Sequence, residues 1–453
     1  MKGSVLATTI VLPLSRPEKG QLQENVTAAA GAALFEPSAD RSRSLWVRKT
    51  GNDLPLQFFW TWLSGVQTKS SVGRIHRTPF LQVLDSIGGF LAAIFFGHLA
   101  LKAGGFWIFL VPLMLLFALG RARKCHMTIV HQAVHDQLFQ IKHIRLRKSL
   151  NRFVAELIGV LIWIPDFKAY RASHAVSHHN HKETATPRDQ DGKEVFTLGS
   201  LQKEKIAVFS SMELETATPL DQDGKEVFLM GFLPGRPRKY YWRLMLKIVR
   251  SPKFYLADLV KRARYSLIVA PWYRRLASAV FLCGLIFIAT SYSAWPTLLL
   301  LYVIPVFPLF RLSGLLQVLS EHMWGTQMHL IGNKDRVPMV CQGRFLFDEV
   351  PSRDLPLSRW LLATLKWWIR VPYHLVIRAC VLCGDLQVHN DHHFHPRSPE
   401  WTNAISACSR HMTEDTEGLY THAWSMGEAL DRVFTAMATA PPLDSNWLQE
   451  LKD

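Results

Sequence analysis

The sequence predicts an all-α integral membrane protein in which two transmembrane helical hairpins, four spans in all, lie under a cytosolic helical cap. Of the 453 residues, 49% are hydrophobic and only 19% are charged, and the mean hydropathy is slightly positive at +0.07. The apolar residues are concentrated in four runs close to the length of about 20 residues that a membrane-spanning helix needs. Most of the 19 histidines lie between or after these runs.

The chain is strongly basic, with a net charge of +16 and a pI near 9.7. Nucleic acid, anionic lipid or an acidic protein would each match this charge. Fifteen tryptophans, several of them close to Lys or Arg, favour the lipid interface, and no nucleic-acid motif is present. The six cysteines are scattered, and their one CxxC pair, Cys380 and Cys383, is only half of a typical zinc site. We therefore expect a membrane partner and no nucleic acid.

Four regions follow one another along the chain. Residues 1–70 are mixed and polar and are expected to form a peripheral extension, residues 75–425 form the membrane domain, and residues 426–453 form a C-terminal tail. Within the domain, ETATPRDQDGKEVF at 183–196 recurs as ETATPLDQDGKEVF at 215–228, identical at 13 of 14 positions. A structural repeat would diverge more and would occur more than twice. Residues 183–228 are therefore interpreted as a duplicated loop of which one copy is dispensable.

The four spans are predicted at about residues 80–101, 104–120, 276–295 and 296–318. Asp85 and His98 interrupt the first span, and Arg311 lies inside the fourth. Short connections join the first span to the second and the third to the fourth, so each pair is predicted to form a hairpin. Basic residues flank the open ends of the hairpins, while the two turns carry only Lys102. The positive-inside rule then places both termini and the large loops in the cytoplasm.

Two further apolar stretches are predicted to lie at the membrane surface. Residues 153–165 are too few to span the bilayer and include Glu156, which favours a re-entrant or interfacial helix. Residues 358–382 mix tryptophan with Lys and Arg, a composition typical of an interfacial amphipathic helix.

Eleven histidines cluster on the predicted cytoplasmic side, after the second span, after the short interfacial stretch, at the end of the fourth span and after the last amphipathic helix. They are His131 and His135; His174, His178, His179 and His181; His322; and His389, His392, His393 and His395. Residues i and i+4 of a helix share a face, so the first pair can point at one centre. In HxxxHH and HxxHH, the adjacent imidazole points about 100° away. The two HH pairs therefore predict two metal ions bridged by shared helices rather than one four-ligand zinc.

Imidazole suits iron, copper and zinc, so the ligand type leaves the metal open. A structural zinc site would be complete with four ligands and would favour cysteines. A copper pair with three histidines each is an alternative, and a di-iron oxidase fits the membrane context best.

In combination, these motifs resemble the membrane fatty acid desaturase superfamily over roughly residues 75–425, with some alkane-hydroxylase-like features. That family carries HxxxH or HxxxxH, then HxxHH or HxxxHH, then HxxHH, and one more histidine near the end of the fourth span. Here YRASHAVSHHNHKETATPRDQD at 170–191 is similar to the second motif, and QVHNDHHFHP at 387–396 is similar to the third. The resemblance implies two non-haem iron ions bound by nine ligands: His131, His135, His174, His178, His179, His322, His389, His392 and His393.

Two positions depart from the acyl-CoA desaturase pattern. Val318 stands where such desaturases can place an asparagine, and Glu321 beside His322 is closer to the Glu-His of alkane hydroxylases. Three acids, Asp136, Glu321 and Asp391, are neighbours of ligands and are expected either to orient imidazoles or to lie on the surface.

The other histidines are assigned no metal. His181 and His395 are expected to donate hydrogen bonds behind the ligands or to lie on the surface, and His98 is left open. Five more are expected to be solvated: His126, His143, His329, His411 and His422.

The resemblance implies an O2-dependent oxidoreductase that introduces a double bond into a fatty acyl or lipid chain. The same scaffold also carries lipid or hydrocarbon hydroxylases and monooxygenases, and a histidine-rich metal transporter or sensor is the alternative of another class. Electrons would come from an external donor of the cytochrome b5, ferredoxin or rubredoxin type with its reductase. The expected location is the endoplasmic reticulum membrane in a eukaryote, or the inner or plasma membrane in a bacterium.

Overall fold

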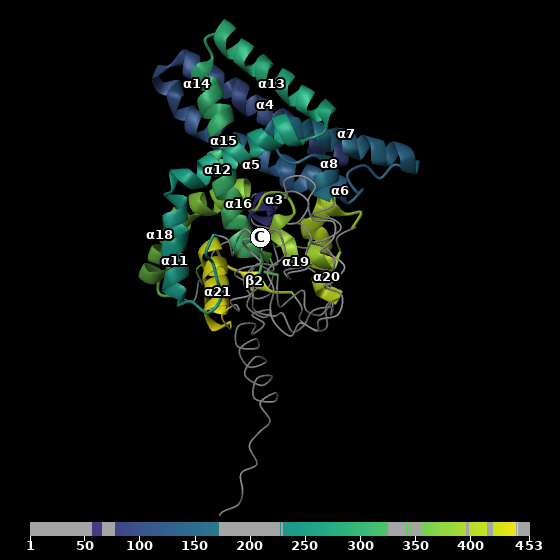
Figure 1. Cartoon of the computed structure of the whole chain (residues 1–453). Coiled ribbons are helices and arrows are strands. Elements are labelled where there is room, and N and C mark those ends of the chain that lie inside the picture. The colour runs from purple at the N-terminus through teal and green to yellow at the C-terminus, as the bar shows by residue number, and fades with distance from the viewer. Residues whose placement is uncertain are drawn as a thin grey trace, which may run out of the picture. The chain divides into compact units, whose positions relative to one another are not determined.

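Figure 1 shows the computed structural model of the chain, in which the described residues are almost entirely helical. The structure describes residues 57–65, 78–171, 230–324, 355–395, 398–414 and 420–440, together with residues 227, 341–342, 344–345, 351 and 442. All of them belong to one compact unit, residues 37–453. Within these residues, four helices are long and apolar enough to cross a membrane. The prediction of an all-α fold with four spans is thereby confirmed.

The first hairpin joins α4 (Pro79–Ala103) to a continuous helical segment made of η2 (Gly105–Phe109), α5 (Leu110–Lys124), η3 (Cys125–Val130) and α6 (His131–Val134). Thr78 caps α4 by accepting a hydrogen bond from the Leu81 amide, and Pro79 occupies the first turn. The helix ends at Gly104, which has a φ of +63°, a conformation that favours glycine. The second segment extends well past the predicted end at residue 120, and its last part contains His131.

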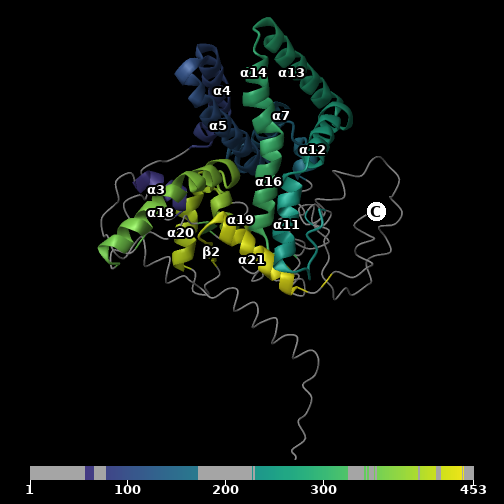
Figure 2. The same ribbon diagram turned by 90° about the vertical axis from the view of Figure 1, so that its left-hand side faces the viewer.

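The second hairpin joins α13 (Trp272–Ser291) to α14 (Trp295–Thr297), η8 (Leu298–Val303), α15 (Ile304–Val306) and α16 (Pro308–Glu321). Figure 2 shows the two hairpins side by side, with α16 leading from the hairpin down to the peripheral helices. The hairpins contact each other closely, because a Cβ on Gly97 would lie 2.3 Å from a Leu301 methyl group. As in the first hairpin, the last segment runs past its predicted end, and it delivers His322.

Two ionisable residues inside the spans, Asp85 and His98, have polar partners. Asp85 forms ion pairs with Arg121 and with Lys124 on the neighbouring α5. His98 Nδ1 lies 2.7 Å from the hydroxyl of Thr297, on the other hairpin. Such pairing reduces the cost of placing ionisable groups in a hydrocarbon environment.

The remaining helices lie toward the ends of the spans that are lowest in Figures 1 and 2. They are α7 (Ile144–Ile162), α8 (Phe167–Tyr170), α11 (Arg238–Val249), α12 (Pro252–Arg264), η7 (Tyr265–Val269), α18 (Leu357–Val376), η11 (Ile377–Val381), η12 (Leu386–Val388), α19 (His389–Phe394), η13 (Trp401–Asn403), α20 (Ala404–Glu414) and α21 (Met426–Thr439). In the described part of the chain, the strands are limited to β1 (Arg344–Phe345) and β2 (His422–Ala423), which pair in parallel.

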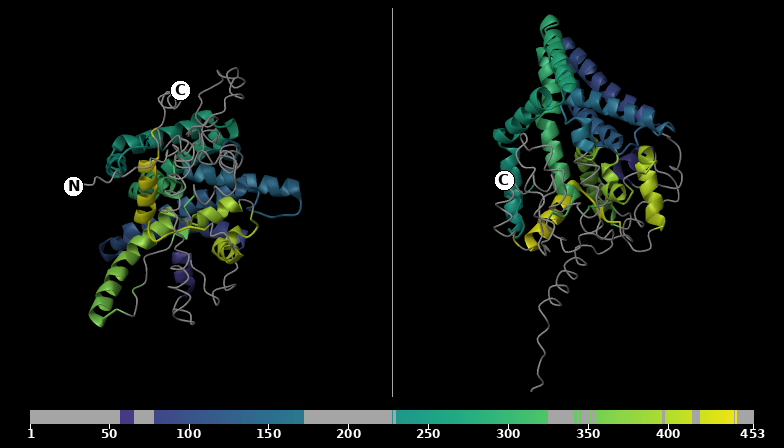
Figure 3. Two further views of the ribbon diagram at one scale, coloured as in Figure 1. Left: turned by 90° about the horizontal axis from the view of Figure 1, so that it is seen from below. Right: turned by 45° about the vertical axis from the view of Figure 1, so that its right-hand side comes forward.

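The two predicted interfacial stretches both lie in amphipathic helices. In α18, Leu361, Leu365 and Ile369 are exposed while Trp367 and Val371 on the opposite face are buried. In α7, Phe153 and Leu157 are likewise exposed. Figure 3 (left) shows α7 and α18 extending outward from the bundle in different directions. Exposed apolar stripes flanked by basic residues fit the membrane–water interface.

An N-terminal helix, α3 (Gln57–Ser64), packs against this part of the fold. Its Leu63 is 2% exposed and forms a small core with Trp367 and Val371 of α18. The Leu63 carbonyl accepts a hydrogen bond of 2.6 Å from Gln387, two residues before His389. This end of the N-terminal extension therefore contacts the segment that leads into the last histidine motif.

Candidate metal centre

A first group of histidines lies where the end of the second span meets α19. His131 and His135 are one helical turn apart and both are buried, with ring centroids 5.0 Å apart. His392 reaches them from α19, and its Nε2 lies 2.6 Å from the Nε2 of His131. One nitrogen from each of the three rings lies within 4.8 Å of the other two.

A second group lies beside the first, at the end of the fourth span. His322 follows the last residue of α16 in an extended conformation, and His389 and His393 lie one turn apart on α19. The Nε2 of His389 lies 3.0 Å from that of His393 and 3.3 Å from that of His322. All three side chains are buried.

Helix α19 divides its histidines between the two groups. His389 and His393 are four residues apart and face the second group, while His392 faces the first. The rings of the adjacent His392 and His393 are separated by 6.2 Å between centroids. This divergence follows from the 100° rotation per residue of a helix. A short HxxHH helix therefore contributes histidines to two neighbouring groups.

The nitrogen positions fit bound cations. Ligand atoms bonded to one metal ion at about 2.0–2.2 Å lie roughly 3–3.5 Å apart, close to the separations of the Nε2 atoms here. Burial of several imidazoles with their Nε2 atoms facing one another is also unfavourable unless a proton or a metal ion lies between them. The donors are all nitrogen, which suits iron, copper or zinc.

Other groups contact the far side of the second group. His322 Nδ1 lies 3.4 Å from the sulfur of Cys341, which is buried, and the backbones of these two residues form a bridge. His389 Nδ1 lies 3.8 Å from a carboxylate oxygen of Glu321, whose other oxygen accepts a 2.9 Å hydrogen bond from Gln317. Partners of this kind fix the orientation of ligating imidazoles. No sequence signal singled out Cys341.

The other two acids have partners other than the six described ligands. Asp136, which has a φ of +60°, forms an ion pair of 2.8 Å with Arg171. Asp391 accepts hydrogen bonds from His395, His411 and Tyr420. Glu321 is therefore the acid among the three whose carboxylate approaches a predicted ligand.

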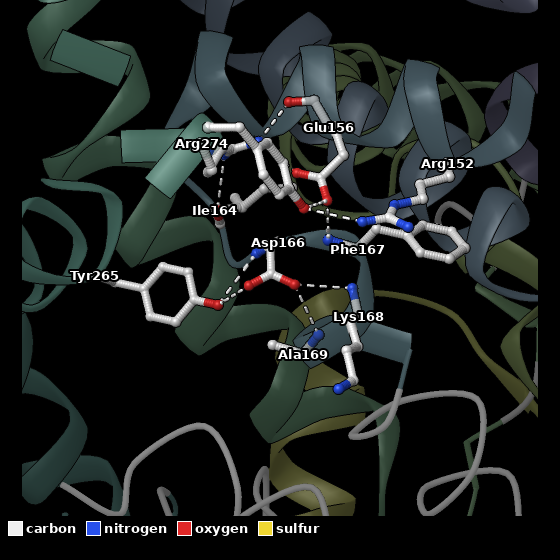
Figure 4. A network of polar contacts seen from close by, with 10 residues as sticks. Arg152, Glu156, Ile164, Asp166, Phe167, Lys168, Ala169, Tyr265 and Arg274 are labelled. Carbon is white, nitrogen blue, oxygen red and sulfur yellow. Dashed lines mark hydrogen bonds and ion pairs between the residues drawn. The ribbon is translucent and has the colours of Figure 1, made fainter. Parts of the chain in front are cut away.

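The second motif, with His174, His178, His179 and also His181, lies outside the described residues, as does most of the duplicated segment. Asp136 and Arg171 nevertheless link the first motif to the residues that lead into the second. The residues that lead up to Arg171 are held in place by a network of polar contacts with α7 and with Arg274 of α13 (Figure 4).

In that network, the buried guanidinium of Arg274 donates to the Glu156 carbonyl, to the Glu156 carboxylate at 3.2 Å and to the Ile164 carbonyl at 3.1 Å. Burial raises the pKa of Glu156, and the nearby Arg274 partly offsets this effect. Asp166 caps α8 by accepting from two amides and also accepts from the Tyr265 hydroxyl. The network therefore fixes residues 163–171 against α7 and α13.

Asp385 is a further buried acid that sequence reasoning missed. It accepts hydrogen bonds from Gln132 at 2.9 Å and from Thr128 at 3.5 Å. Asp385 therefore contacts the residue that follows the predicted ligand His131 in the sequence. Burial raises the pKa of Asp385 to about 6. The preceding Gly384 has a φ of +65° and a Cβ there would overlap the Thr128 hydroxyl, which fits the close approach of the two segments.

The prediction that the remaining histidines are solvated is wrong for three of them. Both ring nitrogens of His126 are buried, and the ring packs 5.0 Å from that of Tyr170. His422 is buried under α21, and His411 is half-buried against Asp391. These environments arise from contacts between distant segments. His143 is exposed and caps α7, and His329 lies outside the described residues.

Comparisons with known proteins agree with this geometry. The model of the family described as "Fatty acid desaturase" matches residues 105–405, which are 301 of the 453 residues. A search of the curated proteins and a search of the solved structures each returned no match. The matched segment contains both described histidine groups, and the family consists in general of oxidoreductases of the desaturase and hydroxylase kind. The chain belongs to the fatty acid desaturase family.

Proposed function

We propose that this protein is a membrane-bound, O2-dependent oxidoreductase that holds two non-haem iron ions and introduces a double bond into a fatty acyl or lipid chain. The observation that carries the proposal is the division of six described histidines into two buried groups, one of His131, His135 and His392 and the other of His322, His389 and His393. The groups lie at the ends of membrane-spanning helices in a chain of the desaturase family.

Each group would hold one iron ion, and His174, His178 and His179 would complete the two coordination shells. When bound, such an iron pair supplies the reductive activation of O2 that allows hydrogen to be removed from an unactivated C–H bond, which side chains alone cannot do. The role of this chain is to hold six imidazoles with ring nitrogens converging in each group. Glu321 and Cys341 fix two of the rings from behind, and the Glu321 carboxylate offsets part of the positive charge.

The proposed topology has both termini in the cytoplasm, because basic residues flank the open ends of the hairpins. The substrate would be a lipid or acyl chain of the surrounding membrane. An external electron carrier with an acidic surface would dock on the basic cytoplasmic face.

The proposal is tested by expression in a host that lacks its own desaturase. Lipid profiling should show products two hydrogens lighter than their precursors, and the purified protein should contain about two iron ions per chain. His322→Ala and His392→Ala, one from each group, should each remove activity and reduce the iron content. His143→Ala is the matched control, since His143 is exposed and belongs to neither group. Purified protein without iron would contradict the proposal.

Hydroxylation is the second candidate function, and a specific observation favours it. The buried Glu321 next to His322 resembles the Glu-His of alkane hydroxylases, and the structure places its carboxylate near His389. If lipid profiling finds products that have gained one oxygen instead of losing two hydrogens, the protein is a hydroxylase rather than a desaturase. Zinc without iron would instead support a metal transporter or sensor.

A further inference from the structure

We propose that Asp391, His395 and His411 form a third metal site, which binds one divalent transition-metal ion such as Zn2+ or Co2+. This site is separate from both histidine groups and does not depend on the proposed oxidation chemistry. It lies on the opposite side of α19 from the second group and joins that helix to α20.

The three side chains present one ligand atom each to a common point. The Nδ1 atoms of His395 and His411 lie 3.3 Å and 2.7 Å from the same oxygen of Asp391. All three ligand atoms lie within 4.8 Å of one another. Atoms that share one zinc ion at about 2.0–2.2 Å are roughly 3–3.5 Å apart, so the arrangement needs only a small adjustment to hold an ion.

The donor set also has suitable chemistry. Two imidazoles and one carboxylate are a combination that binds divalent first-row metals, and they leave positions open for water. The rings of His395 and His411 lie 4.0 Å apart between centroids, so both already face the carboxylate.

An ion could reach this site from solvent. The side chain of His395 is 44% exposed and that of His411 is 23% exposed, while Asp391 at 6% forms the buried floor. A small cavity is lined by Asp391 and His395, by the exposed Glu400, and also by His392 of the first histidine group. In the second histidine group, by contrast, the side chains of His322, His389 and His393 are all buried.

Occupation of the site has a structural consequence. Asp391 lies between His389 and His392 in the sequence, and His411 belongs to α20, so one ion would link the two helices. The ion would therefore fix the short helix that carries three of the predicted iron ligands.

The test uses the full-length protein in detergent, stripped with a chelator and titrated with Co2+, with bound metal counted per chain and followed by visible absorption. Wild-type protein should bind one ion more than His411→Gln or His395→Gln, because glutamine keeps a hydrogen bond to Asp391 but is a poor ligand. The affinity for that ion should fall at least tenfold. His143→Gln, which removes an exposed imidazole elsewhere, should bind as wild type does.

Two further variants distinguish loss of a ligand from loss of local structure. Tyr420→Phe removes a hydrogen bond to Asp391 but no ligand, so it should keep the extra ion. If it loses the ion as His411→Gln does, or if both glutamine variants keep wild-type stoichiometry, the proposal is overturned. The side chain of His395 is 44% exposed, so His395→Gln is the variant expected to fold. If His411→Gln fails to fold, the number of ions bound by His395→Gln tests the proposal. His322→Ala should leave this ion bound even if the iron proposal is wrong.

Discussion

Glu321 lies behind the second histidine group, where its carboxylate is 3.8 Å from His389 and is held by Gln317. In the proposed metal centre, a single buried carboxylate in this place would have two effects. It would favour one orientation of the imidazole, and it would compensate part of the charge of the bound cation. Cys341 contacts His322 in a similar way, though with a weaker hydrogen-bonding atom.

We predict that Glu321→Gln lowers iron affinity about 10- to 100-fold, the usual effect of losing such a partner. Glutamine keeps the volume and the contact to Gln317 but removes the charge. The measurement is the iron retained by purified protein against increasing chelator. Glu414→Gln is the control, because Glu414 is exposed at the end of α20. Equal retention by the two variants would show that Glu321 has no role at the metal.

From the raised pKa of Asp385 we predict that the stability of the metal-free protein depends on pH. Its pKa is raised from 3.8 to about 6 in the fold, so between these values the folded state binds more protons than the unfolded state. The contribution of Asp385 to stability therefore falls as pH rises from about 4 to 6, by about 3 kcal/mol in all. Asp385→Asn should gain stability relative to wild type by up to that amount between pH 4 and pH 7. A constant difference across this range in thermal unfolding would refute the assignment.

At the scale of elements, the long-range contacts depend on close approach between particular helices. Arg274, in the first turn of α13, occupies the surface of α7 over Gly159, where its guanidinium finds three carbonyl and carboxylate acceptors. A Cβ on Gly159 would lie 2.6 Å from both terminal nitrogens of Arg274. Since those nitrogens are fixed by their acceptors, the guanidinium has little freedom to move aside.

Gly159→Ala should therefore destabilise the protein by about 1–3 kcal/mol, the usual cost of overpacking a filled site. The substitution should also displace residues 163–171, which lead into the second histidine motif, and the iron content should fall as a result. Thermal unfolding in detergent measures the first effect. Gly88→Ala is the matched control, because its Cβ would meet one Leu84 methyl group at 3.7 Å, an ordinary contact. A Gly159→Ala protein as stable as that control would contradict the packing argument.

Helix α3 offers a second prediction at this scale. Leu63 is almost completely buried against α18, whereas Phe58 on the same helix is 58% exposed. Leu63→Ala should cost about 2–5 kcal/mol through lost burial and the cavity that remains, and Phe58→Ala should cost much less. Because Gln387 bonds to the Leu63 carbonyl, the Leu63 variant should also lose activity more readily on heating. Similar melting temperatures for both variants would show that α3 does not support the site.

At the scale of the whole molecule, we predict that one copy of the duplicated segment is dispensable. Excision of residues 183–214 joins Lys182 directly to the second copy and leaves the sequence around Val227 unchanged. Val227 is buried, and its carbonyl accepts a hydrogen bond from the Phe232 amide, so this copy is the better one to retain. We expect the shortened protein to keep its iron content, melting temperature and product profile. A loss of iron on excision would show instead that both copies are needed.

Much of the architecture was predictable because it depends on local sequence. The spans follow from runs of apolar residues, and α7 and α18 follow from apolar residues at helical spacing with basic flanks. The pairing of His131 with His135 follows from their i, i+4 spacing, and the divergence of His392 from His393 follows from helix rotation. The far ends of the second and fourth segments were not predicted, because there the polar residues that end an apolar run continue in the same helix.

The sequence by itself determined the class of membrane fold, the four spans and the residue types of the candidate metal centre, because these depend on composition and on spacings of a few residues. Only the tertiary structure decided which histidines meet, as in the contact between His131 and His392, 261 residues apart. It also decided that Glu321 and Cys341 contact the second group and that Asp391 faces His395 and His411. Such contacts are made by side chains from separate helices, and the packing of those helices fixes distances that no local pattern encodes.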